Sequence, residues 1–164
     1  MKTLLLAGII FCNEFLNAQT KGDSTSNPLK TNEYKVSFKK PDSNFITLSG
    51  GAGYTLAAMN ATINGSLFPG NYQVAEAELK RIKSSAQLKL VDTLHHLLGP
   101  KHAFTIIQEQ GDSPNNISGE YILVTTIIPH NRHATFMVVG IYPKAHDNYL
   151  RKKFIEASLT IKVE

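Results

Sequence analysis

Two long apolar segments near the end of the chain constrain its fold more than any other feature. Residues Tyr121–Ile128 and Thr135–Tyr142 are almost continuously apolar and rich in Ile, Val and Thr, which favours strands over helices. The link between them, Pro129-His130-Asn131-Arg132-His133, is short and polar and suits a hairpin. Strands that are apolar on both faces belong in the middle of a sheet that is covered on both sides. The sequence therefore predicts a central hairpin inside a layered domain.

Further strands are predicted on both sides of this hairpin. Alternating or short apolar segments indicate strands at residues 34–39, 45–48, 104–109 and 159–163. Residues 54–63 fit either a strand or a short helix, and Asn64-Gly65 after them is a turn signal.

Two helices are predicted as well. The longer one is indicated by a stripe of apolar residues at steps of three and four, ending at Gly99-Pro100, a typical helix stop. The stripe consists of Ala75, Leu79, Ile82, Ala86, Leu90, Leu94 and Leu97. A shorter helix, capped by Asp147, would place Leu150, Phe154 and Ala157 on one face. The expected fold is α+β: an antiparallel sheet covered by one long and one short helix, a layered sandwich.

The closing half of the chain resembles PsbP-like domains, over roughly residues 86–163. The resemblance lies in element order and apolar spacing, and it contains no catalytic motif. It is carried by Gly119–Val124, the hairpin into Phe136–Val139, the helix Leu150–Phe154 and the tail Ser158–Lys162. The resemblance implies a non-enzymatic module that docks onto protein complexes.

The first residues have the pattern of a cleavable bacterial export signal. Lys2 precedes an apolar stretch at residues 4–11, which is too short to span a membrane, and Ala18 suits the position before cleavage. We therefore expect a signal peptide at residues 1–18, a polar tether at 19–32 and one globular domain at 33–164, located in the periplasm or secreted. The only cysteine, Cys12, lies in the signal, so the mature domain is expected to contain no cysteine.

Charge indicates little about the partner. The formal net charge is +4, and the lysines and arginines are dispersed along the sequence without the interleaved aromatic residues of single-strand nucleic-acid binders. We predict no nucleic-acid partner, no membrane span and no cofactor.

Candidate chemical sites are sparse. His130 and His133 share one link, but a zinc site needs a third ligand that the sequence does not identify, so we predict no metal site. The glycine-rich segment 49–53 lacks the lysine of a phosphate loop and is interpreted as a turn. No catalytic residue is assigned. His130, Arg132 and His133 are the candidate partner or ligand surface, because polar loops held by a rigid sheet commonly make contacts.

The sequence thus favours an exported, non-catalytic accessory or binding module that acts on an envelope or extracellular protein. Two alternatives remain open. One is a small metal-dependent or hydrolytic enzyme whose ligands converge only in the fold, and the other is a small-ligand carrier. Partner, ligand and oligomeric state are not predicted.

Overall fold

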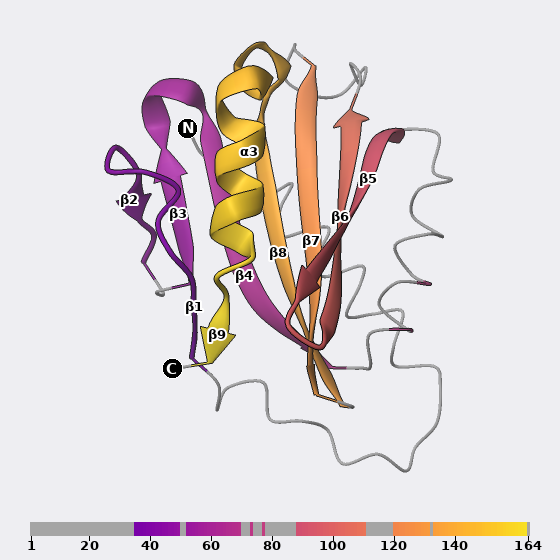
Figure 1. Cartoon of the computed structure of the whole chain (residues 1–164). Coiled ribbons are helices and arrows are strands. Elements are labelled where there is room, and N and C mark those ends of the chain that lie inside the picture. Colours follow the sequence, from indigo (N-terminus) through magenta and orange to yellow (C-terminus); the bar gives the residue numbers. More distant parts are fainter. Residues whose placement is uncertain are drawn as a thin grey trace, which may run out of the picture. The chain divides into compact units, whose positions relative to one another are not determined.

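In a computed structural model, the chain builds one large antiparallel sheet with a helix packed on it (Figure 1). The structure describes residues 35–49, 52–69, 73, 77, 88–110, 120–131 and 133–163. These residues belong to a compact unit that spans Thr31–Glu164. The main sheet has seven strands in the order β2 (Ile46–Thr47), β3 (Gly53–Leu56), β4 (Ala61–Pro69), β8 (Ala134–Pro143), β7 (Tyr121–Asn131), β6 (Lys101–Gln110) and β5 (Leu88–Leu98). A separate ribbon is formed by β1 (Val36–Ser37) and β9 (Lys162–Val163).

The centre of the sheet is formed by β6 (Lys101–Gln110), β7 (Tyr121–Asn131) and β8 (Ala134–Pro143). Their side chains are buried on both faces, which confirms the prediction for the central hairpin. One face, which carries α3, includes Ala103, Ile107, Ile122, Val124, Ile128, Phe136 and Val138. The opposite face includes Phe104, Ile106, Leu123, Ile127 and Met137, all at most 7% exposed.

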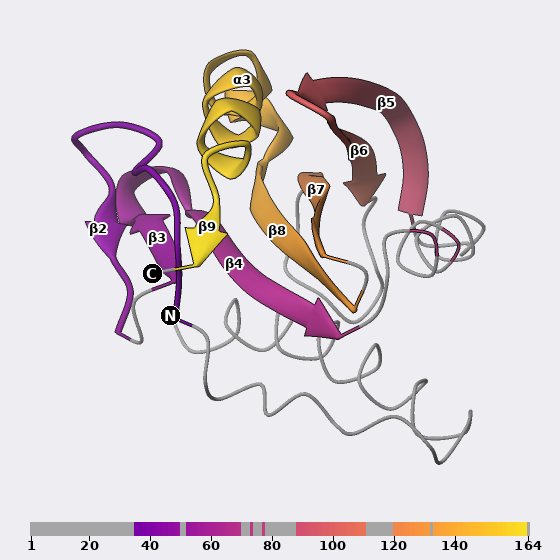
Figure 2. The ribbon, with the colours of Figure 1, turned by 60° about the horizontal axis from the view of Figure 1, so that its bottom comes forward.

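The predicted short helix is present as α3 (Asp147–Ser158), and it buries Leu150, Phe154 and Ala157 as expected. It packs on β7 and β8, and the sheet curves around the side that carries it (Figure 2). The cap prediction was wrong by one position, because the N-cap residue is His146, without a side-chain hydrogen bond to the helix. Asp147 is instead the first helical residue, where a carboxylate interacts favourably with the helix dipole.

The segment left open between strand and helix contains both. β3 (Gly53–Leu56) leads into a 3-10 turn at Ala57–Met59, and Asn60 then adopts a φ of 48° before β4 (Ala61–Pro69) begins. The turn predicted at Asn64-Gly65 is wrong, because both residues lie inside β4 and pair with β8. Glycine is needed there for close packing: a Cβ on Gly65 would lie 3.0 Å from side-chain carbons of Phe38 and Ile161.

The second half of the predicted long helix is a strand. β5 (Leu88–Leu98) pairs antiparallel with β6 at the edge of the sheet. The first four residues of the predicted stripe, Ala75, Leu79, Ile82 and Ala86, lie outside the described part of the chain. Gly99-Pro100 does not end a helix but forms the tight turn between the paired residues Leu98 and Lys101. Gly99 supplies a φ of +61° at the first turn position, and the fixed negative φ of proline suits the next. The α+β fold class is confirmed, with α3 as the covering helix among the described residues.

The remaining strands are short. β2 (Ile46–Thr47) pairs with β3 at the other edge of the sheet. β1 (Val36–Ser37) and β9 (Lys162–Val163) join the two ends of the described chain in one ribbon. None of the helices in the described residues is long and apolar enough to cross a membrane.

Candidate interaction site

Two hairpin turns lie at the same end of the sheet, opposite the end where α3 begins (Figure 1). One is the Gly99-Pro100 turn between β5 and β6, and the other joins β7 to β8, whose last pair is Asn131 and Ala134. The ammonium group of Lys101 donates to the backbone oxygen of His130 over 3.4 Å, which links the two turns. We call these two neighbouring turns, residues 97–102 and 130–134, the hairpin tips.

The predicted surface residues lie in the second tip. The ladder between β7 and β8 shifts register between Pro129 and Asn131, so His130 is the extra residue of a bulge. Its half-buried ring packs against Phe136, with 4.8 Å between centroids. His133 is exposed, and its backbone N–H donates to Oδ1 of Asn131 over 2.8 Å. Arg132 lies outside the described residues.

The first tip extends this surface, and the sequence did not reveal it. Lys101 and His102 are exposed there, and Leu97, which pairs with His102, is 74% exposed. The sequence does not identify these residues as a group, because the stripe from Ala75 to Leu97 predicts a helix that ends at Gly99-Pro100 and not a hairpin. The signal that could have identified them is Gly99-Pro100, since glycine at the first position of a two-residue turn is also a hairpin signature.

The hairpin tips are cationic within the described part of the chain. The described carboxylates are Asp42, Asp92, Glu109, Glu120, Asp147 and Glu156. All of them except Asp92 form ion pairs with cations outside the tips, and Asp92 accepts a hydrogen bond from the backbone of Thr93. The exposed side chains of Lys101, His102 and His133 therefore have no described carboxylate in contact.

The described residues of the tips do not form a metal site. Across the described residues, no three side chains of the types His, Cys, Asp or Glu converge as metal ligands would. A third ligand for His130 and His133 is therefore not found in that part of the chain.

A hydrogen-bonded chain runs inward from β5 to the centre of the sheet. His96 Nε2 and Thr105 Oγ1 are 2.9 Å apart, and Thr105 Oγ1 lies 2.9 Å from Oγ1 of Thr126. Burial lowers the pKa of His96 below its ordinary value, and the neighbouring His95 adds to this effect. Both threonine side chains are fully buried, so neither hydroxyl can reach a substrate in solution as a nucleophile.

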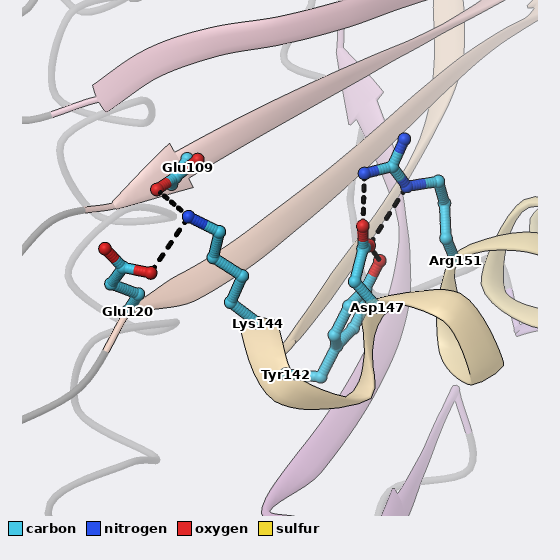
Figure 3. Close-up of polar contacts among 6 residues, drawn as sticks. All are labelled: Glu109, Glu120, Tyr142, Lys144, Asp147 and Arg151. Carbon is cyan, nitrogen blue, oxygen red and sulfur yellow. Dashed lines mark hydrogen bonds and ion pairs between the residues drawn. The ribbon is translucent and has the colours of Figure 1, made fainter.

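The polar groups at the opposite end of the sheet are paired with one another (Figure 3). Nζ of Lys144 lies 2.6 Å from Oε1 of Glu109 and 2.9 Å from Oε2 of Glu120. These hydrogen bonds raise the pKa of the lysine, which therefore stays protonated. This protonated lysine connects Glu109 near the end of β6 and Glu120 just before β7 to the turn that precedes α3. It is not available as a base.

A second network holds the first turn of α3. The hydroxyl of Tyr142 donates to Oδ1 of Asp147 over 2.9 Å, and Arg151 donates to both carboxylate oxygens of the same residue (Figure 3). Burial raises the pKa of Tyr142 far above its ordinary value, and the bond to Asp147 raises it further. A phenol that is buried and keeps its proton has a structural role here, and we assign no chemistry to this network.

No protein-family model matches this sequence, and no curated protein matches it either. Solved structures with a similar fold do exist. LpqN, involved in cell envelope biogenesis of Mycobacterium tuberculosis, has 11% identity and a TM-score of 0.57, over 85% of this chain and 87% of LpqN. PsbP from the cyanobacterium Synechocystis has 8% identity and a TM-score of 0.47, over 88% and 99% of the two chains.

The Ran-binding protein Mog1p of Saccharomyces cerevisiae has 9% identity and a TM-score of 0.48, over 79% of this chain and 95% of Mog1p. At such identities the likeness concerns the fold alone. The order of hairpin, helix and final strand expected from the PsbP-like resemblance is present in β7, β8, α3 and β9.

Proposed function

We propose that this chain is an exported binding module that recognises a protein partner through its hairpin tips. The observation that carries the proposal is the position of the tips. Buried central strands hold two turns side by side, and these turns present Lys101, His102 and His133 to solvent with no described carboxylate in contact. Loops held by a rigid sheet are common contact sites, and Arg132 adds a further cation to the same loop.

A binding role also fits the remaining polar groups of the described structure. Outside the tips, three polar groups described above are either buried or occupied: Thr105 is inaccessible, Lys144 is held by two carboxylates, and Tyr142 keeps its proton. The predicted signal at residues 1–18 directs the search for a partner to the envelope or the medium. LpqN, which shares the fold, is itself involved in cell envelope biogenesis.

The proposal can be tested by site-specific crosslinking. A photoreactive amino acid at position 133 should crosslink one envelope protein, and the purified partner should then bind wild-type protein in a titration. We expect the triple change His130→Ala, Arg132→Ala and His133→Ala to weaken this binding at least tenfold. The free energy of unfolding should fall by no more than about 1 kcal/mol, because His133 is exposed and the ring of His130 is only half-buried. The matched control is Lys152→Ala, an exposed residue of α3.

Two results would contradict the proposal. Unchanged affinity in the triple variant would show that the three changed residues of the tips do not contribute to partner binding. One tightly bound zinc ion per wild-type chain, lost in the triple variant, would support the metal-dependent alternative instead.

A further inference from the structure

Lysines that are far apart in the sequence lie close together on the ribbon formed by β1 and β9. In this ribbon Ser37 lies directly opposite Lys162, and Val36 lies opposite Val163. The backbone N–H of Lys39 donates to Oγ1 of Thr160 over 2.7 Å, which continues the pairing beyond β1. Residues 121 positions apart are thus held side by side by the register of two short strands.

Alternation along the ribbon decides which side chains face outward. Val36, Phe38 and Ile161 are at most 9% exposed, and Phe38 and Ile161 pack beside Gly65 of β4. Successive side chains of a strand point to opposite faces, so Lys35, Ser37 and Lys39 lie on the outer face with Lys162. All three of these lysines are exposed, as is Lys40, which follows directly. We call these four residues the lysine ribbon.

The charge of the lysine ribbon is not compensated within the described residues. The cations that form ion pairs there are Lys144, Arg151, Lys152 and Lys153. Asp42, the nearest described carboxylate in the sequence, is occupied by Lys153 at 3.2 Å and by the hydroxyl of Tyr149 at 2.7 Å. The acidic neighbours Glu33 and Glu164 lie outside the described part of the chain.

The spacing of these lysines matches an extended acidic chain. Four residues of a strand span about 13 Å, and neighbouring strands lie about 4.8 Å apart, so Lys162 lies roughly midway between Lys35 and Lys39 and one strand to the side. Carboxylates on alternate residues of an extended peptide repeat about every 6.7 Å, which brings three of them to these three ammonium groups.

The types of side chain on the outer face further limit the chemical class of the partner. Among the described residues, the outer face of the ribbon presents lysines and Ser37, with no aromatic ring on which a base could stack and no apolar side chain that could enter a bilayer. Lysine acts as a flexible point charge and does not form the bidentate contacts that arginine makes with phosphate. These features favour a row of carboxylates over nucleic acid or lipid.

We propose that the lysine ribbon is a docking surface for an extended acidic segment of a partner protein, with carboxylates on alternate residues. This surface is separate from the hairpin tips, and it would add a second point of contact. Two contacts on one partner raise the overall affinity beyond either alone when both can be engaged together.

The test uses a fluorescently labelled peptide of alternating Asp and Ser, titrated with the mature protein at low salt. We expect Lys39→Gln with Lys162→Gln to weaken binding about fivefold, since exposed charge pairs contribute modestly. The control pair Lys89→Gln with Lys152→Gln removes the same charge elsewhere and should change affinity less than twofold. A peptide of identical composition with all Asp residues at one end should bind more weakly, and the triple tip variant should bind like wild type.

Each other outcome overturns the proposal. An equal loss of affinity in both double variants would show that peptide binding depends only on the net charge of the protein. Equal binding of the two peptides would show that the spacing is not recognised. Binding to vesicles containing phosphatidylglycerol that depends on Lys39 and Lys162, without binding to the alternating peptide, would identify the ribbon as a membrane-docking surface.

Discussion

The hydroxyl of Tyr142 donates a hydrogen bond over 2.9 Å to the carboxylate of Asp147, so a buried residue of β8 holds the first residue of α3. The aromatic ring of Tyr142 is fully buried and meets Phe154 edge-on at 5.1 Å, so the same side chain also contacts the middle of the helix. Tyr142 therefore fixes both the start and the packing of α3.

Removing only the hydroxyl of Tyr142 tests this relationship. Tyr142→Phe keeps the ring and should lower the free energy of unfolding by about 1.5 kcal/mol, the usual effect of losing a hydrogen bond to a charged group. The matched control is Tyr149→Phe, which loses a bond of 2.7 Å to Asp42 at a side chain that is 40% exposed and should cost clearly less. Equal losses in urea denaturation would show that burial does not strengthen the Tyr142 bond.

The contact between Gly140 and Phe154 gives a second prediction. A Cβ on Gly140 would lie 2.2 Å from Cδ2 of Phe154, so Gly140→Ala should destabilise the protein by about 1–3 kcal/mol through overpacking.

Phe154→Ala should lower the free energy of unfolding by about 3–5 kcal/mol because the ring is fully buried, whereas Lys152→Ala should have almost no effect.

A double-mutant cycle makes the Gly140 prediction specific. In a Phe154→Leu background, which has a smaller side chain at this contact, Gly140→Ala should cost less than in the wild-type background. Additive losses would contradict the proposed contact.

The parts of the fold that could be predicted are those encoded by residues close together in the sequence. The strands β7 and β8 and the apolar face of α3 are encoded in short segments, and both predictions were confirmed. β5 was assigned wrongly because Leu90, Leu94 and Leu97 are spaced by four and three residues, as on one face of a helix. In the strand, Leu94 pairs with Thr105 and Leu97 pairs with His102, so these two leucines lie on opposite faces of the sheet.

The candidate sites were partly predictable for the same reason. His130, Arg132 and His133 are adjacent in the sequence, so they could be proposed together. Lys101 comes close to them only because β5 and β6 form a hairpin, and the sequence pattern predicts a helix in place of β5. The lysine ribbon could not be predicted, because it depends on the register between β1 and β9 at opposite ends of the domain.

Gln108 offers a prediction of increased stability. The residue is 3% exposed, and its Nε2 has no hydrogen-bond partner among the described residues. Leaving a buried donor unsatisfied costs about 1–3 kcal/mol, so Gln108→Met, which keeps the length but removes the amide, should raise the melting temperature. Gln110→Met at the end of the same strand, where the side chain is half-buried, serves as the control. A lower melting temperature for Gln108→Met would show that the amide has a partner in solution.

Export gives a prediction that requires only a mass measurement. Protein recovered from the envelope or the medium should lack residues 1–18, because Ala18 and the apolar stretch before it fit signal cleavage. Full-length chain, or chain carrying lipid on Cys12, would contradict this prediction.

The pH dependence of stability is set in part by His96. Its pKa is lowered in the folded state mainly by burial, so the folded protein binds a proton at this site less readily than the unfolded chain, whose histidines titrate near pH 6.5. As pH falls below about 7, the unfolded state gains protons first, and stability decreases until the folded-state pKa is also passed. Melting temperatures at neutral and mildly acidic pH should therefore differ less in His96→Gln than in wild type. His133→Gln, at an exposed site, should retain the wild-type difference, and loss of the difference in both variants would contradict the role of burial at His96.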